Sequence, residues 1–347
     1  MLEPHEIEAL EAALREKLPS LDQKGVRNVR RAHGVGAREI HHFELVYEDT
    51  AGEQTRGLLL RREMEAGAHE GRLALEHAAY QSFQDVDVPT PTPIAFAAEG
   101  GALGRPYLIA ERSAQGQLAS LFSADPYGAH REAIGRRFFS ILGAIAAVDP
   151  YDTQIPGIVD TPAPEDCWRR ELDHWESVID DNALEPQPIA AAAIRRLRRN
   201  PPAPPPKLSV VHGNFRNGNF LHDGQGGITG VVDWELAHIG DPMEDVAWAL
   251  DPVWAGASKL AAGLIDIDEA IKPWQEASGR RFNGEAFRWW SLFANVKGLA
   301  IWLSSAKAFH ENKNTDPVLA FAGWHFTTRH NSIIAHRLSE AAPGSLI

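Results

Sequence analysis

Residues 210–235 read VVHGNFRNGNFLHDGQGGITGVVDWE, which is the most informative stretch of the sequence. Asn219 stands at the start of one short apolar segment, and Asp233 closes the next, Ile228 to Val232. The glycines between the segments favour a tight turn, so the pattern predicts a β-hairpin whose open ends lie close together. Magnesium prefers hard oxygen ligands, which the Asn219 amide and the Asp233 carboxylate both offer. The stretch therefore predicts one magnesium site shared by the two residues.

The loop before this hairpin has the spacing of a kinase catalytic loop, with His212 at its start and Arg216 inside it. Phosphoryl transfer needs the phosphate charge neutralised, the acceptor hydroxyl held in line and its proton removed. The position of the proton acceptor is occupied by Asn214, and an amide takes up no proton at neutral pH. General-base help is typically worth about 10²–10⁴-fold, so the sequence predicts a slowed phosphotransferase.

Three interpretations of Asn214 remain open at this point. The chain could be a kinase that uses another base or little base catalysis. It could be a nucleotide-binding pseudokinase with a regulatory role. The asparagine could also be a substitution introduced in place of a natural aspartate.

Residues 210–250, VVHGNFRNGNFLHDGQGGITGVVDWELAHIGDPMEDVAWAL, resemble the catalytic core of the aminoglycoside phosphotransferase/choline kinase-like family. The family pattern is His-Gly-Asp, four residues, Asn, then Asp-Trp-Glu and Gly-Asp-Pro with Glu-Asp shortly after, and this chain lacks only the first Asp. Its Trp-Glu and Glu-Asp-Val-Ala-Trp variant is most similar to a branch of kinase domains fused to acyl-CoA dehydrogenases. The resemblance implies ATP as the phosphoryl donor, Mg²⁺ as the cofactor and a small-molecule hydroxyl as the acceptor.

The resemblance also implies roles for individual residues. Asn219 and Asp233 would hold Mg²⁺. His212 would brace the catalytic loop, in which Asn214 and Arg216 are the other candidate catalytic residues.

The remaining implied roles concern the nucleotide. Arg61 stands where the family has a basic residue for the α- and β-phosphates, and Glu76 would be its ionic partner. Arg62 competes with Arg61 for this role, because adjacent strand residues face opposite sides of a sheet. The other implied nucleotide-binding residues are Gly34 and Gly36 in a phosphate-covering loop, and Glu111 and Arg112 at the hinge.

The arrangement of apolar residues predicts an α+β, bilobal, protein-kinase-like fold. Residues 1–112 would form a small antiparallel-sheet lobe, residues 113–117 a hinge, and residues 118–347 a large, mainly helical lobe. The segment NPPAPPP at 200–206 is either a stiff connector or a polyproline ligand for a partner. Helices are expected at 3–17, 68–84, 129–148, 165–181, 187–199, 241–250, 266–278, 284–311 and 316–338, and strands at 27–33, 38–48, 55–62, 93–98, 106–112, 208–211, 219–222 and 228–233.

Composition narrows the class of protein further. The net charge of −13 argues against general nucleic-acid binding. The longest apolar run, Phe138 to Val148, is about half the length that a membrane span needs. The acidic N-terminus is unlike a signal peptide, and the single cysteine, Cys167, favours a reducing compartment. We expect a soluble, cytoplasmic protein that binds neither nucleic acid nor membrane.

Two classes of acceptor follow from the resemblance. An aminoglycoside would need acidic residues lining its pocket, whereas a hydroxyacyl-CoA thioester would need basic residues near the mouth. The arginines between 195 and 199 could meet the second need, although positive charge is favoured at a helix C-terminus in any case. All ten tryptophans follow residue 167, which favours an apolar or ring-containing acceptor.

Overall fold

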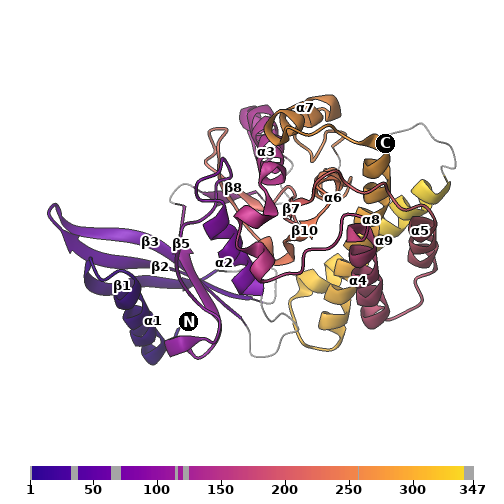
Figure 1. The fold of residues 1–347 in the computed structure, drawn as a ribbon. Helices are drawn as coiled ribbons and strands as arrows, with labels where there is room; N and C mark the ends of the chain where they lie inside the picture. Colours follow the sequence, from indigo (N-terminus) through magenta and orange to yellow (C-terminus); the bar gives the residue numbers. More distant parts are fainter. Residues whose placement is uncertain are drawn as a thin grey trace.

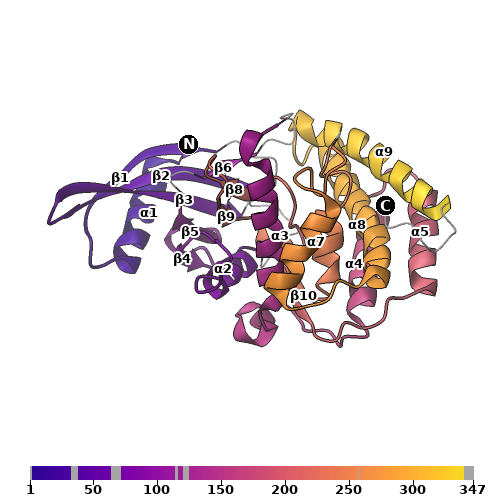
Figure 2. The ribbon, with the colours of Figure 1, turned by 90° about the horizontal axis from the view of Figure 1, so that it is seen from above.

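The computed structural model describes residues 2–32, 38–63, 72–113, 116–119, 125–256 and 258–339. An antiparallel sheet with two helices forms one side of the molecule, and a larger group of helices forms the other (Figure 1). Seen from above, the two parts lie beside each other along the long axis (Figure 2). The expected α+β arrangement of a small sheet lobe and a large helical lobe is confirmed.

The small lobe is a five-stranded sheet with a helix on each face. Leu58 and Leu60 pack in one apolar cluster with Leu10 and Leu14 of α1 (Pro4–Lys17). The side chains of the alternate strand residues point to the other face of the sheet and pack against α2 (Arg72–Ser82), because successive strand residues alternate between faces. The strand order is β1-β2-β3-β5-β4, with bounds Asp22–Arg31, Arg38–Asp49, Gly52–Glu63, Tyr107–Glu111 and Pro93–Ala97 respectively.

Seven helices of four residues or more lie in the described part of the large lobe. α3 (Arg131–Ala147) lies beside α7 (Ile267–Ser278), and α8 (Gly284–His310) lies beside α9 (Pro317–Ser339), in both views (Figures 1 and 2). The aromatic stripe of α8 is core, since Trp290 and Phe293 are fully buried. The other helices are α4 (Cys167–Asn182), α5 (Pro188–Arg199) and α6 (Met243–Ala249).

Two small sheets within the large lobe hold the predicted catalytic loop. β7 (Ser209–Val211) pairs with β10 (His238–Gly240), and β8 (Phe220–His222) lies between β6 (Gln117–Leu118) and β9 (Ile228–Val231). Residues 212–219 run from β7 to β8, so each end of the loop is anchored in a sheet. Single 3₁₀ turns lie at Gly101–Leu103, Gly128–His130, Pro150–Asp152, Ile155–Gly157 and Trp234–Leu236.

The predicted elements are present where the structure describes them, with ends shifted by a few residues. The strand predicted at 27–33 begins earlier, at Asp22, and β6 and β10 were not predicted. The first residues of the helix predicted at 68–84, and residues 114 and 115 of the predicted hinge, lie outside the described part of the chain. Residues 200–206 join α5 to β7 without regular structure, as a connector would.

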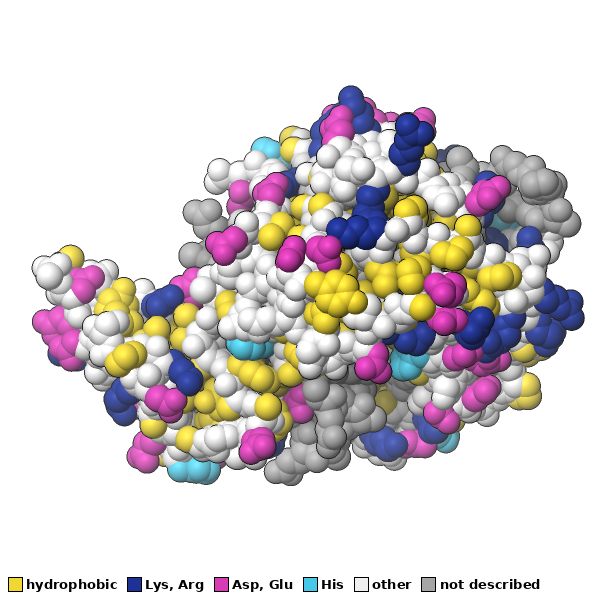
Figure 3. Space-filling view, viewed as in Figure 1, with side chains coloured by type: hydrophobic (Ala, Val, Ile, Leu, Met, Phe, Trp, Pro, Cys, Tyr) yellow, Lys and Arg dark blue, Asp and Glu magenta, His cyan; other side chains and the backbone are white. Residues whose placement is uncertain are grey.

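On the face drawn in Figure 3, acidic and basic side chains are interspersed, and neither sign covers the face. None of the helices in the described ranges combines the length and the apolar character that a bilayer crossing requires.

Candidate active site

The predicted hairpin forms, and its open end brings Asn219 and Asp233 together. Phe220 pairs with Val231 across β8 and β9, and the Val232 N–H donates to the Asn219 carbonyl at 3.1 Å. The Asn219 Nδ2 atom lies 3.2 Å from the Asp233 Oδ2 atom. The two side chains are therefore close enough to bind one cation.

The free oxygens of this pair fit magnesium. Asn219 Nδ2 also donates to the main-chain carbonyl of Asn214 at 2.8 Å, which turns the nitrogen end of the amide toward the loop. Among the described residues, no donor contacts Oδ1 of Asn219 or Oδ1 of Asp233. Asp233 itself has φ +71°, in the left-handed region, which aspartate tolerates better than most side chains. Two hard oxygens thus remain available for a hard divalent cation.

Asn214 contacts the same carboxylate. Its Nδ2 atom donates to Asp233 Oδ2 at 2.6 Å. An aspartate here would bring two carboxylates to this separation, and like charges so close repel unless a cation or proton lies between them. Asparagine instead donates a hydrogen bond and occupies one oxygen of Asp233. Asn214 therefore contacts a predicted metal ligand as well as occupying the predicted position of the base.

His212 is held in one neutral form. Its Nδ1 atom accepts from the Asn214 N–H at 3.1 Å, so Nε2 carries the proton and donates to the Val232 carbonyl at 3.2 Å. Burial lowers the pKa of His212 to about 4, although the nearby Asp233 carboxylate opposes this. A neutral ring tied at both nitrogens supports the bracing role expected from the resemblance and leaves no nitrogen for proton transfer.

The side chain of Asp245 also holds the catalytic loop in place. Its carboxylate accepts from the main-chain N–H groups of His212 and Gly213 at 2.6 and 2.9 Å. Gly213 has φ +75°, and a Cβ atom there would lie 2.2 Å from the Leu236 carbonyl oxygen, so only glycine fits. Asp245 is itself buried, so this brace is shielded from solvent.

The structure separates Arg61 from Arg62. Arg61 forms an ion pair with Glu76 of α2, and Tyr80 donates to the same Glu76 carboxylate at 2.6 Å. Arg62 lies on the opposite face, where it pairs with Glu6 and Glu39 at 2.5 and 2.9 Å. Burial acts to lower the pKa of Arg61, but neighbouring carboxylates, including Asp233, raise it. Arg61 therefore lies on the α2 face of the sheet, close enough to Asp233 to feel its charge, and its expected pairing with Glu76 is present.

The predicted hinge residues use their side chains elsewhere. The Glu111 carboxylate pairs with Arg56, two residues before Leu58 on the face of the sheet that α1 covers. The Arg112 guanidinium lies against Gly57, and its main-chain N–H donates to the Gly57 carbonyl at 3.0 Å. Any contact of these residues with a nucleotide would thus come from the backbone. Gly34 and Gly36 of the predicted phosphate-covering loop lie outside the described residues.

Arg216 lies in the catalytic loop beside an aromatic wall. Its guanidinium carbon lies 4.6 Å from the centre of the Trp254 ring, and Nη1 donates to the Asn217 carbonyl at 3.0 Å. Asn217 is itself held by the Tyr127 hydroxyl at 2.5 Å and by the Ala262 carbonyl at 3.0 Å. These contacts fix the far side of the loop to two other segments of the large lobe.

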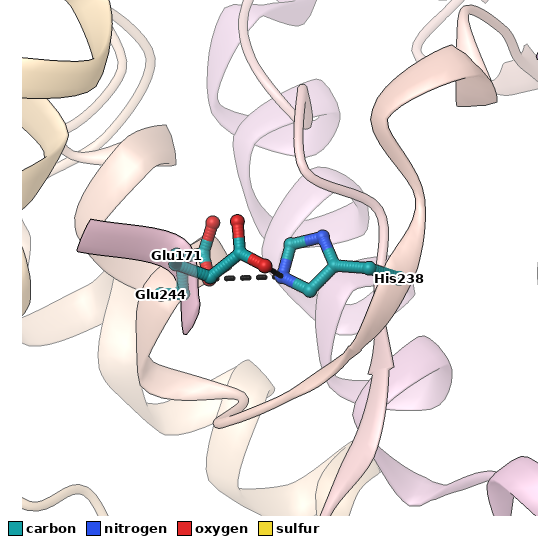
Figure 4. A group of neighbouring side chains, drawn as sticks. All are labelled: Glu171, His238 and Glu244. Atoms are coloured by element: carbon teal, nitrogen blue, oxygen red, sulfur yellow. Dashed lines mark hydrogen bonds and ion pairs between the residues drawn. The ribbon is translucent and has the colours of Figure 1, made fainter. Parts of the chain in front are cut away.

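A buried group of charged residues supports α6, the helix that carries Asp245. Figure 4 shows Glu171, His238 and Glu244 converging, with His238 Nε2 at 3.0 Å from Glu244 and 3.7 Å from Glu171. Lys297 of α8 pairs with the other Glu244 oxygen at 2.9 Å. This network was not predicted from the sequence, although a lysine inside the apolar stretch FANVKGLA was a signal.

The geometry of these three residues would allow a metal ion, but their partners already neutralise them. Burial opposes the charge on His238, yet Glu171 and Glu244 raise its pKa to about 9, so the ring is protonated at neutral pH. Lys297 and His238 together lower the pKa of Glu244 against the effect of burial. Arg170 pairs with Glu171 at 3.3 Å. An added dication would lie among three cations, which favours an ion-pair network over a metal site.

Replacing Lys297 with methionine is expected to destabilise the protein by about 3–5 kcal/mol, because one oxygen of the buried Glu244 loses its cation. Urea unfolding followed by tryptophan fluorescence measures the loss. The double variant Lys297→Met/Glu244→Gln is the matched control and should recover part of the stability. An unchanged unfolding midpoint for Lys297→Met would contradict the network.

The raised pKa of His238 predicts a loss of stability in alkaline solution. A folded-state pKa of about 9, above the ordinary 6.5, means that the stabilisation is complete below pH 6.5 and is lost as pH rises through 9. At about 1.4 kcal/mol per pH unit for one proton, the loss across this window is roughly 2–3 kcal/mol. Urea unfolding at pH 6.5, 7.5 and 9 tests it. His238→Gln should flatten the dependence, and an equal slope in both proteins would refute the assignment.

The fold has a protein-kinase-like architecture. The chain belongs to the phosphotransferase enzyme family (APH), whose family model matches residues 43–280. Viomycin phosphotransferase from Streptomyces vinaceus is 30% identical over 174 residues, which cover 47% of this chain and 56% of that protein. Acyl-CoA dehydrogenase family member 11 from Gallus gallus is 24% identical over 178 residues, 50% of this chain and 22% of that protein. The matched region thus spans little more than half of one relative and about a fifth of the other.

Solved structures share the fold along nearly the whole chain. A candidate aminoglycoside phosphotransferase from Ralstonia eutropha superposes with a TM-score of 0.70 at 20% identity, covering 96% of this chain and 98% of that one. A thermostable mutant of aminoglycoside phosphotransferase APH(4)-Ia, in complex with AMP-PNP and hygromycin B, gives 0.60 at 19% identity, with 97% and 99% covered. These likenesses confirm the predicted bilobal kinase-like fold. The family model confirms the predicted family, and the match to acyl-CoA dehydrogenase family member 11 agrees with the predicted similarity to the fused branch.

Proposed function

We propose that this chain transfers the γ-phosphoryl group of ATP to a hydroxyl of a small molecule. The observation that carries the proposal is the contact between Asn219 and Asp233, whose two Oδ1 atoms are left for a divalent cation. Mg²⁺ bound there would neutralise phosphate charge as the bond to the γ-phosphorus breaks. Membership of the phosphotransferase family and the nucleotide analogue in a structural neighbour support ATP as the donor.

Each site residue would have its own role in phosphoryl transfer. Arg61, held by Glu76, would contact the α- and β-phosphates from the small lobe. His212 and Asp245 would keep the catalytic loop in shape. Asn214 would accept a hydrogen bond from the acceptor hydroxyl through its amide oxygen without removing the proton. Positioning and electrostatics supply most of the acceleration in this chemistry, so a slow transfer remains feasible.

Arg61 and Arg62 offer a test of the nucleotide site within one strand. Arg61→Met is expected to weaken ATP binding by about tenfold or more, because a charge-assisted contact to phosphate is lost, typically about 1.5–3 kcal/mol. Arg62→Met should lower thermal stability and leave ATP affinity within about twofold of wild type, because Arg62 pairs on the other face. Calorimetric titration with ATP and Mg²⁺ decides, and equal ATP affinities in the two variants would reject this role for Arg61.

The alternative is a nucleotide-binding protein with a regulatory role and no useful transfer. The hydrogen bond from Asn214 to Asp233 favours it, because it takes up an oxygen of the metal ligand. ATP turnover in the presence of a hydroxyl acceptor separates the two. Turnover by the unmodified chain above about 1 s⁻¹, the low end for kinases, would reject the regulatory alternative.

The acceptor class that we favour is apolar or ring-containing. The ring centres of Trp254 and Trp302 lie 6.3 Å apart, and those of Trp302 and Phe326 lie 4.6 Å apart, so aromatic side chains follow one another outward from Arg216. Hydroxyacyl thioesters and antibiotics of the kinds named for the relatives are the two classes to compare. A thermal-shift screen with hydroxyacyl-CoAs, aminoglycosides, choline analogues and sugars, each with ATP and Mg²⁺, would separate them, because a ligand that binds the folded state raises the midpoint.

A further inference from the structure

A cavity of about 930 Å³ lies in the large lobe, away from every residue assigned to phosphoryl transfer. It is bounded by the connector before β7, the start of α6, the end of α7 and the start of α8. Its volume falls within the usual range for small-molecule sites, about 300–1,000 Å³. Neither Asn214, Asn219 nor Asp233 is among its lining residues.

The position of the cavity follows from the ribbon of β7 and β10. These strands are antiparallel, with His238 opposite Val211 and Gly240 opposite Ser209. His212 leaves β7 at one end of the ribbon, whereas Asp241 leaves β10 at the other end and enters the cavity wall. Three residues of strand separate the two ends by about 10 Å. The cavity is therefore behind the catalytic loop and is separate from its cleft.

Among the charged side chains of the cavity wall, more cations than carboxylates lack a partner. Arg280 is already used, since its guanidinium donates to the Ala146, Lys207 and Leu208 carbonyls at 3.0, 2.7 and 3.3 Å. The side chain of Lys207 pairs with Asp149 at 2.9 Å.

Two other lining arginines, Arg281 and Arg288, form no ion pair or hydrogen bond with any residue in the described ranges. The Asp241 carboxylate is committed to the Met243 N–H and to Trp290 Nε1, both at 2.9 Å. Glu285 is the only other lining carboxylate. Two guanidinium groups of the wall thus lack a partner, against one carboxylate. In a chain of net charge −13, this local excess of positive charge favours the binding of an anion.

The remaining wall is apolar and flat. Pro205 and Met243 are buried, Phe282 is half-buried, and Trp274 has 1% of its surface exposed. Planar rings and proline faces suit a flat apolar body.

We propose that this cavity is a second ligand site, which takes an organic anion with a flat apolar body. Arg281 and Arg288 bind the anionic group, and the walls formed by Trp274, Phe282 and Pro205 contact the body. This site shares no residue with the proposed phosphotransfer reaction, so the two proposals can be tested independently.

The fluorescent probe 8-anilinonaphthalene-1-sulfonate has this chemistry, and N-phenyl-1-naphthylamine is its counterpart without the sulfonate. Fluorescence titration of the full chain is expected to give saturable binding of one sulfonate probe per chain, at least tenfold tighter than the neutral probe. Saturating ATP with Mg²⁺ should leave the signal in place. Equal affinity of the two probes, or displacement by ATP, would overturn the proposal.

Two double variants show whether the sulfonate probe binds in this cavity. Arg281→Ala/Arg288→Ala is expected to weaken the sulfonate probe at least tenfold, with circular dichroism confirming that the variant is folded. The matched control, Arg131→Ala/Arg329→Ala, removes the same charge from exposed positions of the large lobe and should stay within twofold of wild type. An equal loss in both double variants would mean a general charge effect, and no loss in the first would exclude the cavity. Either result refutes the proposed site.

Discussion

Replacing Asn214 with aspartate is expected to raise the rate of ATP-dependent transfer by about 10²–10⁴-fold, the range that general-base help supplies. The variant would regain a group able to accept the proton of the acceptor hydroxyl. It would also remove the amide donor that now occupies Asp233 Oδ2 at 2.6 Å. Single-turnover assays with ATP, Mg²⁺ and the acceptor found in the screen measure the change. If neither the wild type nor the variant transferred phosphate to any hydroxyl acceptor, the kinase proposal would lose its basis.

The same substitution has a second consequence that does not require turnover. Two carboxylates at the position of Asn214 and Asp233 repel, so Asn214→Asp should melt earlier than wild type without metal and recover when Mg²⁺ is added. Asn214→Ala is the matched control, because it frees the Asp233 oxygen without adding a charge or a base. It should show neither the early melting without metal nor the faster transfer. Equal behaviour of the two variants would mean that freeing Asp233, and not the new carboxylate, is what matters.

The hairpin and the loop could be predicted because the information is local. Gly224, Gly226 and Gly227 specify the turn of the hairpin, and the pairing of two short strands then sets the distance between their ends. Gly213 is also local, because its positive φ belongs to a tight loop that no other residue can form beside Leu236. Such features depend on a few neighbouring residues, and sequence spacing carries them directly.

The choice between Arg61 and Arg62 could not be made in this way. Both residues lie on one strand, and only the packing of α1 and α2 on opposite faces assigns each guanidinium to a partner. The same holds for Glu111, whose side chain turns to Arg56 because its register on β5 faces α1. The sequence shows which residues of a strand share one face of the sheet. Only the packed structure shows which of the two faces borders the catalytic loop.

The buried network behind the loop was the least predictable part. Glu171, His238 and Lys297 belong to α4, β10 and α8, and they meet around Glu244 only after these elements pack together. Both oxygens of the Glu244 carboxylate contact buried cations, one on each of two other elements. Long-range charge pairing of this kind depends on tertiary contacts that local spacing does not encode.

Replacing Asp233 with asparagine is expected to reduce transfer by about 10³-fold or more. A bound metal typically supplies several kcal/mol of charge stabilisation in the transition state, and each 1.36 kcal/mol is a tenfold change in rate. The measurement is best made in the faster Asn214→Asp background, where the loss has room to appear. Asp223→Asn is the matched control, because Asp223 lies in the turn of the same hairpin and accepts from Gln225 and Gly227.

Nucleotide binding distinguishes loss of the metal from general damage to the hairpin. With Mg²⁺ present, ATP should raise the melting temperature of wild type and of Asp223→Asn, and much less that of Asp233→Asn. Without Mg²⁺, the three proteins should respond to ATP alike, because Arg61 and the sheet are unchanged. If Asp233→Asn kept the full magnesium-dependent stabilisation, the cation would have to be held by other oxygens. The pairing of Asn219 with Asp233 would then be structural, and the proposed phosphotransfer would lose the contact on which it rests.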